Sequence, residues 1–232
     1  MSRLIRVIVA DDHPPTRAGV RIALEANGFE VCAEVGNAAS AIEAARRELP
    51  DVCLLDIHMP GDGIHAAEEI SRELPETAVV MLTVSRTDSD LFDALRAGAS
   101  GYLLKDAELS EISAAIRAVA AGLCAVAPGI AGVLLEFVRS TPARPAERTP
   151  GASVALSPRE RDVLTLLCQG CDNGDIARQL FVSASTVKHH VSRILEKIGA
   201  SNRVQAATFA VRAGFYDGSP VSATGWSDRR AA

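Results

Sequence analysis

The 232-residue chain has no apolar run long enough to cross a bilayer, and its first residues show no signal-peptide pattern. A spanning helix needs about 20 consecutive apolar residues, and a signal peptide needs a charged start followed by an apolar core. Cysteine is scarce as well. There are five cysteines, an odd number, and Cys32 and Cys53 fall in expected strands, where a free thiol packs as a small apolar group. We therefore expect a soluble cytoplasmic protein in a reducing compartment, with no membrane contact.

Acidic and basic residues are unevenly distributed along the chain. Residues 1–139 carry 12 Lys and Arg against 21 Asp and Glu, a net charge of −9, and residues 140–232 carry 12 against 8, a net charge of +4. The overall charge of −5 hides this difference. A basic half joined to an acidic half indicates two separate tasks, and the basic half is the candidate to meet nucleic acid. The excess is small, so charge alone is weak evidence.

The first half of the sequence alternates short apolar runs with helical stretches. Strands are expected near residues 4–10, 30–35, 51–55, 78–83 and 101–104. Helices are expected near residues 15–27, 38–48, 64–73, 88–97 and 109–122. This alternation predicts parallel strands joined by crossover helices, an α/β doubly wound domain over residues 1–125.

A linker is expected over residues 126–152. Residues 128–138 predict a short connecting helix with Pro near its start. Residues 140–151 contain three prolines and no apolar residue larger than Ala, so they cannot bury a face and predict a flexible tether. At the other end, the tail of residues 217–232 is rich in Gly, Ser and charge and is expected to be disordered.

Between linker and tail, residues 153–216 predict a small all-α domain. Ser157 is placed as an N-cap, Pro158 stands at the first helical position, and Glu160 completes a capping box. Four helices are expected, near residues 158–169, 173–180, 184–198 and 203–213. A tight turn separates the second from the third, which is the pattern of a helix-turn-helix.

Polar residues follow four of the predicted strands. Asp11 and Asp12 follow the first strand, Asp56 the third, Thr83 the fourth and Lys105 the fifth. Because ligands of such sheets gather at the carboxyl ends of the strands, we expect these side chains at one edge. Crowded carboxylates need a cation between them, and an all-oxygen site with few protein ligands suits Mg²⁺.

The pocket has the chemistry to receive a phosphoryl group. A carboxylate can act as a nucleophile and form an acyl phosphate when a metal and a lysine neutralise the incoming oxygens. Asp56 is the candidate acceptor, because the adjacent Asp11 and Asp12 are better placed as a metal-binding pair. Lys105 supplies a point charge, and the hydroxyl of Thr83 can bond a phosphate oxygen. The alternative is that these are ordinary strand-end polar residues, which becomes a poor explanation for all of them together.

Here the sequence resembles the receiver domain of bacterial two-component response regulators, over residues 3 to about 122. The residues that carry the resemblance are Asp11-Asp12, Asp56, Met59-Pro60, Thr83, Tyr102 and Lys105. The resemblance implies a flavodoxin-like fold with five parallel strands. One departure is visible, because the stretch from Met59 to Gly63 is one residue shorter than the commoner Met-Pro-Gly-x-Asp-Gly form.

The same resemblance implies roles for single residues. A sensor histidine kinase would donate phosphate to Asp56, and Mg²⁺ would be held by Asp12, Asp56 and the backbone carbonyl of His58. Thr83 and Tyr102 would relay the change as switch residues. Without this context, Tyr102 reads equally well as a strand aromatic at a rim.

The helix expected at residues 184–198 has two distinct faces. Its apolar residues recur with helical spacing and bury one face; they are Val187, Val191, Ile194, Leu195 and Ile198. The other face is polar and cationic, with Ser185, Lys188, His189, Ser192, Arg193 and Lys197. Such groups can reach base edges and phosphates from a helix in the major groove. On an isolated helix this face would more often be merely solvated.

Residues 155–215 resemble the LuxR-type DNA-binding domain. The residues that carry the resemblance are Leu156 to Arg161, Asp175-Ile176-Ala177 and Ser185 to Val191. It implies base or groove contacts for Lys188 and His189. It implies positions nearer phosphates for Ser185, Thr186, His190, Arg193 and Asn202. Gly174 and Asp175 stand where the family more often has Lys and Glu, so one backbone contact is in doubt.

Together the two halves resemble the NarL/FixJ arrangement of response regulators. We expect a DNA-binding regulator in which phosphorylation of Asp56 controls homodimerisation and transcription from double-stranded promoter DNA. Two alternatives are a DNA-binding protein that does not depend on phosphate, and a phosphoryl-transfer enzyme that turns Asp56 over. The sequence offers the enzyme no substrate cleft and no further acid–base group, so we expect a regulator and not an enzyme.

Two further pairs of residues could suggest metal or redox chemistry. His189 and His190 are adjacent on a helix and point about 100° apart, so they cannot chelate one ion together. Cys168 and Cys171 have the spacing of a CxxC motif, which can bind zinc or sense redox state. No second such pair lies nearby, so packing is favoured and a redox role stays open.

Overall fold

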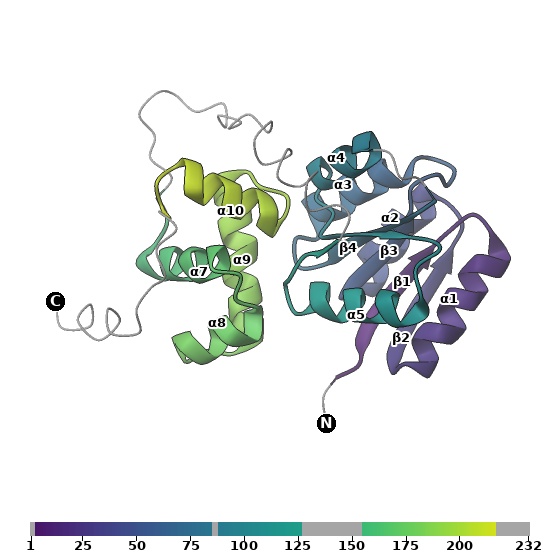
Figure 1. Ribbon diagram of the computed structural model, residues 1–232, viewed down its shortest axis with the longest axis horizontal. Helices are drawn as coiled ribbons and strands as arrows, with labels where there is room; N and C mark the ends of the chain where they lie inside the picture. Colours follow the sequence, from purple (N-terminus) through teal and green to yellow (C-terminus); the bar gives the residue numbers. More distant parts are fainter. Residues whose placement is uncertain (1–2, 85–87, 127–154, 217–232) are drawn as a thin grey trace.

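The structure is a computed structural model that describes residues 3–84, 88–126 and 155–216. Figure 1 shows two units, a strand-containing domain and a separate group of helices. The strands of the first domain are β1 (Ile5–Ala10), β2 (Phe29–Val35), β3 (Val52–Asp56), β4 (Ala78–Thr83), β5 (Gly101–Leu104) and β6 (Ala125–Val126). Its helices are α1 (Pro14–Ala26), α2 (Ala38–Glu48), α3 (Gly63–Glu73), α4 (Asp88–Arg96) and α5 (Leu109–Ala120).

All neighbouring strands of the sheet are parallel, in the order β2-β1-β3-β4-β5-β6. The order reverses direction beside β1, so the carboxyl ends of β1 and β3 border the point where ligands of such sheets bind. The register pairs Ala10 with Leu55 and Thr83 with Leu104. The ends of β1, β3, β4 and β5 therefore lie at one edge of the sheet, as the sequence predicted.

Two hydrophobic clusters hold the helices against the sheet. On one face α1 and α5 pack through residues such as Leu24 and Ile116, which are 2% and 0% exposed. On the other face α2, α3 and α4 pack through Ala41, Ile70 and Leu95. The strands between them are covered on both sides, which explains why they read as continuous apolar runs.

The second unit has four helices among the described residues: α7 (Pro158–Cys168), α8 (Asn173–Leu180), α9 (Ala184–Ile198) and α10 (Arg203–Arg212). Ser157 accepts a hydrogen bond from Glu160 N and forms the predicted capping box with the Glu160 side chain. Ser183 caps α9, and Gly199 ends it in the left-handed conformation at φ 69°. These local signals placed the helices correctly.

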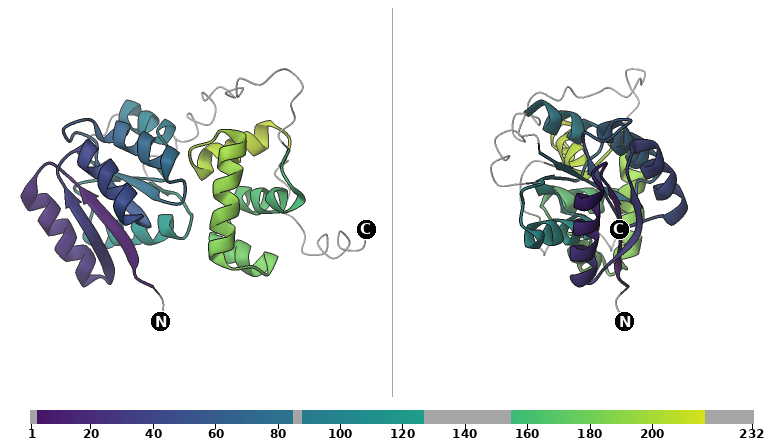
Figure 2. Two further views of the ribbon diagram at one scale, coloured as in Figure 1. Left: turned by 180° about the vertical axis from the view of Figure 1, so that it is seen from behind. Right: turned by 90° about the vertical axis from the view of Figure 1, so that its right-hand side faces the viewer.

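The views in Figure 2 show α9 as the long helix of the second unit, on the side that faces the sheet domain. The fold confirms the predicted doubly wound domain and the four-helix domain. Sequence analysis missed the two-residue strand β6 at the edge of the sheet. The connecting helix, the tether and the disordered tail lie outside the described residues and stay predictions. Within the described ranges, no helix is long and apolar enough to span a membrane.

Candidate functional site

Three carboxylates and one lysine converge at the carboxyl edge of the sheet. Asp11, Asp12 and Asp56 each offer an oxygen within 4.8 Å of the others. Lys105 Nζ lies 2.8 Å from Asp11 Oδ2 and 3.0 Å from Asp56 Oδ2. Asp11 and Asp56 are buried, at 2% and 4% exposure, whereas Asp12 is exposed. The pocket thus holds two desolvated carboxylates bridged by one ammonium, with a third carboxylate at its mouth.

The bridge has an electrostatic consequence for Lys105. Burial disfavours its charged form, but hydrogen bonds to Asp11 and Asp56 outweigh that and raise the pKa of Lys105 above its usual value. The Asp11 carboxylate is also fixed from the other side, since His13 N donates to Asp11 Oδ1 at 2.8 Å. Lys105 is therefore a permanent positive charge beside the Asp56 oxygen.

The loop after Asp56 is tightly built around it. Gly63 lies so close to the acceptor that an added Cβ would stand 1.9 Å from the backbone oxygen of Asp56. Gly63 N donates to Ile57 O at 2.9 Å, and Asp62 caps α3 by accepting from Ile64 N. Asp62 adopts a positive φ of 67°. Only glycine fits at position 63, and the shortened loop closes without displacing Asp56 from the strand end.

Thr83 and Tyr102 lie together beneath the pocket. Thr83 is fully buried at the end of β4, and its side chain hydrogen-bonds that of Tyr102, which is 2% exposed. Burial and the nearby negative charge of Asp90 in α4 raise the pKa of Tyr102 to about 12, so its hydroxyl is protonated at neutral pH. Asp90 also lies 3.9 Å from the ring of His58, which follows the acceptor by two residues. Asp90, at the start of α4, thus interacts with Tyr102 and lies near His58.

The donor set of the pocket fits a hard divalent cation. The three carboxylate oxygens are close enough to share one ion, and hard cations such as Mg²⁺ take oxygen ligands and keep some of their waters. The Lys105 ammonium beside these oxygens is protonated, so it cannot be a metal ligand. The geometry is thus compatible with the predicted metal site.

In the helical domain, the amino end of α9 carries a group of hydroxyls. The Ser183 hydroxyl lies 2.7 Å from that of Ser185 and 2.8 Å from that of Thr186, all exposed. Backbone N–H groups at a helix start attract phosphate oxygens. The predicted phosphate contacts Ser185 and Thr186 are thus free of the protein core, and the exposed Arg193 lies further along the same helix.

Other predicted DNA-binding residues of α9 are engaged within the protein. Lys197 Nζ lies 2.6 and 2.7 Å from the two carboxylate oxygens of Glu160 in α7. Ser192 is 8% exposed and donates to Lys188 O. His190 is half-buried, and burial together with the charge of Arg159 lowers the pKa of His190. Their DNA contacts stay predictions.

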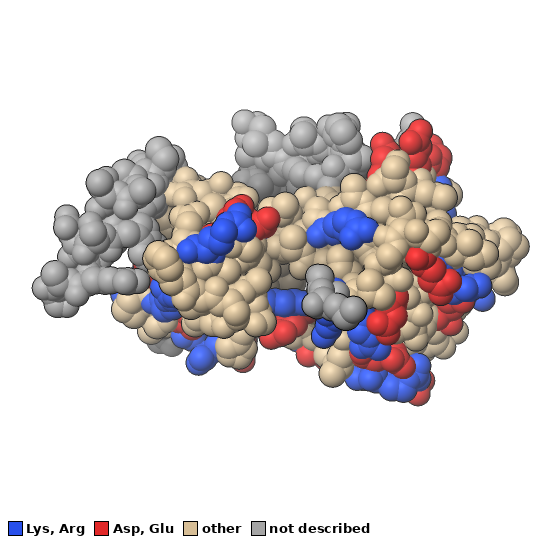
Figure 3. Space-filling model, turned by 90° about the horizontal axis from the view of Figure 1, so that it is seen from below, with Lys and Arg blue, Asp and Glu red and all other residues tan. Residues whose placement is uncertain are grey.

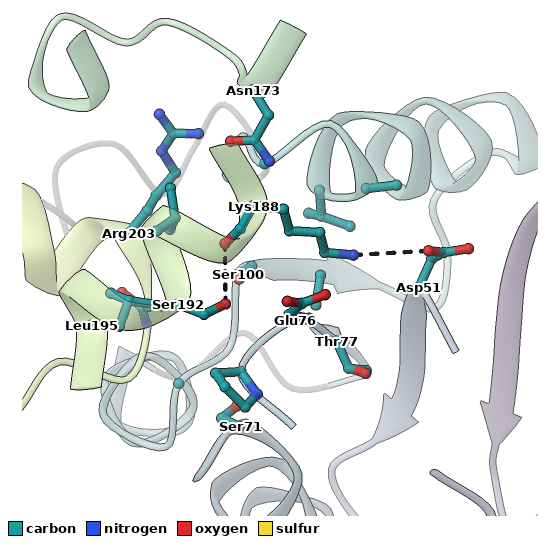
Figure 4. Close-up of a pocket in the computed structure, with 18 of the residues that line it drawn as sticks. Asp51, Ser71, Glu76, Thr77, Ser100, Asn173, Lys188, Ser192, Leu195 and Arg203 are labelled. Carbon is teal, nitrogen blue, oxygen red and sulfur yellow. Dashed lines mark hydrogen bonds and ion pairs between the residues drawn. The ribbon is translucent and has the colours of Figure 1, made fainter. Parts of the chain in front are cut away.

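The polar face of α9, which carries Lys188 and His189, is turned toward the sheet domain. Lys188 Nζ lies 3.8 Å from Asp51 Oδ1, just before β3, as Figure 4 shows, and His189 Nδ1 lies 3.9 Å from Glu76 Oε1. A cleft of about 710 Å³ lies between the domains, and the α9 residues that line it include Ser185, Lys188, His189 and Arg193. In Figure 3, Lys and Arg side chains lie next to Asp and Glu side chains where the two domains meet.

This arrangement brings part of the polar face of α9 against the sheet domain, with the Lys188 side chain 28% exposed and the His189 side chain 61% exposed. A recognition helix must enter the major groove, which is about 12 Å wide, with its polar face against base edges. The sheet domain occupies that side of α9. In this conformation Lys188 and His189 therefore face acidic side chains of the same chain rather than phosphates.

Asn202, a predicted DNA contact, is buried between the two domains. It is 2% exposed, caps α10 by accepting from Gln205 N, and donates to the carbonyls of Leu95 and Ala99 at 3.0 and 3.1 Å. A hydrogen bond between backbone atoms, from Asn173 N to Ala121 O at 2.9 Å, also joins the domains. These polar interdomain contacts had no signal in the sequence.

The cysteines show no sign of redox chemistry in this conformation. All five fall within the described residues and all are free thiols. Burial raises the pKa of Cys168 to about 11, which keeps its thiol protonated. This supports packing for Cys168, and a redox role for the Cys168–Cys171 pair stays open.

Comparisons with known proteins agree with both halves of the chain. Residues 7–117 match the response regulator receiver domain, and residues 154–210 match the luxR family of bacterial regulatory proteins. The transcriptional regulatory protein YxjL of Bacillus subtilis (strain 168) is 42% identical over 214 residues, which cover 90% of this chain and 96% of the relative. The nitrate/nitrite response regulator protein NarL of Escherichia coli (strain K12) is 37% identical, over 88% of this chain and 93% of the relative.

A solved structure supports the sheet domain in the same way. The signal receiver domain of the response regulator NarL from Mycobacterium tuberculosis has a TM-score of 0.50 and 40% identity, and it covers 52% of this chain and 99% of that chain. A parallel sheet with an acidic pocket and a lysine, joined to a helix-turn-helix unit, defines a receiver coupled to a DNA-binding domain. The chain belongs to the two-component response regulators with a LuxR-type DNA-binding domain. The relatives are transcriptional regulators. They therefore support the expected class, a regulator, over the alternative of a phosphoryl-transfer enzyme.

Proposed function

We propose that Asp56 accepts a phosphoryl group from a sensor histidine kinase and that this event controls DNA binding through α9. The observation that carries the proposal is the buried Asp56 carboxylate with Lys105 Nζ 3.0 Å away and two further carboxylates beside it. One Asp56 oxygen attacks phosphorus, and the bond from phosphorus to the imidazole nitrogen of the donor breaks. An acyl phosphate on Asp56 and a dephosphorylated donor histidine remain; the histidine leaves as neutral imidazole, with the electron pair of the broken bond on one ring nitrogen and a proton on the other.

The neighbouring residues have defined tasks in this reaction. Asp11, Asp12, Asp56 and the backbone carbonyl of His58 would hold Mg²⁺, which supplies positive charge to the phosphoryl oxygens. The Lys105 ammonium loses one partner when the Asp56 carboxylate becomes an acyl phosphate, and it then pairs with a phosphoryl oxygen. Thr83 donates its hydroxyl to a second oxygen and thereby changes its contact with Tyr102.

The conformation in which α9 faces Asp51 and Glu76 is the inactive one in this proposal. Phosphate bound preferentially to a receiver state that does not hold α9 shifts the population toward the open form. Lys188 and His189 are then free to contact bases, and Ser185, Thr186 and Arg193 phosphates. Two open chains occupy paired half-sites of promoter DNA as a homodimer, which sedimentation of the chain with and without acetyl phosphate tests.

The acceptor is tested by the mass of the intact protein after incubation with Mg²⁺ and acetyl phosphate. Wild type should gain one phosphoryl mass, and Asp56→Asn should gain none because the amide is not a nucleophile. Asp62→Asn is the matched control: it makes the same change beside the pocket, keeps an N-cap for α3 and should be labelled like wild type. Persistent labelling of Asp56→Asn, or loss of labelling in both variants, contradicts the assignment.

A further inference from the structure

The first turn of helix α4 lies near two residues that surround the phosphoacceptor pocket, His58 and Tyr102. Asp90, in this turn, acts on the Tyr102 hydroxyl, which hydrogen-bonds Thr83, and lies 3.9 Å from the His58 ring. Two of these residues are close to the acceptor, since Thr83 ends the neighbouring strand β4 and His58 follows Asp56 by two positions, and Tyr102 lies one strand further on, in β5. A change at the pocket that moves Thr83 or Tyr102 therefore changes the surroundings of Asp90 at the start of α4.

At its other end α4 is held by the DNA-binding domain. Asn202 Nδ2 donates to Leu95 O and Ala99 O, and Gln205 Nε2 donates to Leu95 O at 2.9 Å and to Arg96 O at 3.4 Å. The last carbonyls of a helix have no partners within it, so outside donors bind them readily. The donors here come from more than 100 residues away in the sequence.

The side chain of Asn202 bonds two helices at once. Its Oδ1 accepts from Gln205 N and caps α10, while its Nδ2 holds the carboxyl end of α4, and the residue is 2% exposed. Ser201 lies against the turn after α4, where a Cβ on Gly98 would stand 3.0 Å from Ser201 Cβ. The contact is thus closely packed and sensitive to a displacement of α4.

We propose that Asn202 and Gln205 are positioning residues that hold the closed form through the carboxyl end of α4. This rests on the proposed function. A helix of nine residues spans about 13 Å, so a movement imposed at Asp90 reaches Leu95 without any other moving part. When α4 shifts, the hydrogen bonds that the side-chain amides of Asn202 and Gln205 donate to its carbonyls are lost, and the polar face of α9 is uncovered.

The sharpest test substitutes Asn202→Ser in the full chain. Serine is as good an N-cap as asparagine, so α10 keeps its cap, but the shorter side chain cannot reach the α4 carbonyls. Loss of two neutral hydrogen bonds should tighten binding of unphosphorylated protein to its promoter fragment on the order of 5- to 30-fold. Gln205→Glu is a second variant: its carboxylate can still accept from Ser201 N but offers the carbonyls no donor. Asn27→Ser, which changes an exposed Asn at the end of α1, is the control.

A second readout separates coupling from a purely structural role. Because DNA and beryllofluoride, a phosphoryl mimic, both bind the open form in this proposal, Asn202→Ser should raise the affinity of the Asp56 pocket for beryllofluoride by the same factor as the affinity for DNA. A variant that merely destabilised the fold would not bind the mimic more tightly. Both readouts are expected to move together, and the control should leave both at their wild-type values.

Each other outcome has a distinct meaning. If wild type responds to phosphorylation but Asn202→Ser has wild-type affinity for DNA and beryllofluoride, the proposal that Asn202 holds the closed form is refuted. If Asn202→Ser weakens DNA binding in both the phosphorylated and the unphosphorylated protein, Asn202 is a DNA contact and the proposal is again overturned. If wild type itself does not respond to phosphorylation, the proposed function fails, whatever the variants do.

Discussion

Replacing Glu160 by Gln should destabilise the DNA-binding domain in a pH-dependent manner. Glu160 is 2% exposed and bonds Lys197 Nζ through both carboxylate oxygens, at 2.6 and 2.7 Å, and also accepts from Ser157 N. Burial alone would raise the pKa of this carboxyl, but the bonds from Lys197 and Ser157 lower the pKa of Glu160 from 4.5 to about 2. Glutamine keeps the shape of the side chain and can still accept from Ser157 N, but it loses the charge.

The size of the effect follows from that pKa. At about 1.4 kcal/mol per unit, the lowering of the Glu160 pKa sets an upper limit of roughly 3.4 kcal/mol. Lys197 is 34% exposed, and solvent screens part of the attraction. We therefore expect a loss of about 2 kcal/mol at pH 7. Because the pKa is lower in the folded state, the stabilisation is complete above about pH 5 and disappears as the pH falls from 4.5 toward 2.

Urea unfolding of the full chain, followed by hydrogen exchange in peptides from α7 and α9, measures this stability without interference from the receiver. Glu196→Gln, which changes an exposed acid of α9, is the control and should match wild type. Equal stability of Glu160→Gln and wild type at pH 7 would refute the reasoning. So would a difference between them that is still undiminished near pH 2, because the carboxylate is then protonated in part.

Three further substitutions test other parts of the structure. Lys105→Met removes the ammonium between Asp11 and Asp56, so the free energy of unfolding of the receiver should fall by roughly 3 kcal/mol. Mg²⁺ should raise the melting temperature of this variant more than that of wild type. An equal effect of Mg²⁺ on both proteins would contradict the pocket electrostatics. Gly63→Ala places a Cβ against Asp56 O and should lower receiver stability by about 3 kcal/mol in thermal unfolding; an unchanged melting temperature would show that the loop can relax. Lys188→Ala should weaken promoter binding of the phosphorylated chain by about 1–3 kcal/mol in a gel-shift assay, and phosphoryl uptake should stay normal. Unchanged affinity for the promoter would remove Lys188 from the DNA-binding surface.

Features that depend on local sequence were predictable. The capping box of Ser157 and Glu160 sets the start of α7 through residues only three positions apart, and Gly199 ends α9 because it adopts a left-handed conformation. The pocket was predictable for a different reason. A parallel sheet brings the ends of its strands to one edge, so Asp56 and Lys105 had to meet once the alternation of strands and helices was recognised.

Features that depend on contacts between distant residues were not predictable. Lys197 has the spacing of a DNA-facing residue, yet it pairs with Glu160, 37 positions away. Asn202 was predicted near phosphates, but a polar side chain in a loop gives no sign that it will be buried against another domain. Asp90 was missed because nothing in the periodicity of α4 distinguishes it from other exposed acids. The covered face of α9 likewise depends on a domain arrangement that no single segment specifies.

The most direct test of the central claim is the affinity of the full chain for its own promoter fragment, measured with and without acetyl phosphate and Mg²⁺, beside Asp56→Asn. We expect tighter binding by wild type after phosphorylation, roughly tenfold or more since typical coupling between sites is 5- to 150-fold, and no response of Asp56→Asn. Equal affinity of phosphorylated and unphosphorylated wild type would contradict this claim, because α9 would then be available for DNA whatever the state of Asp56.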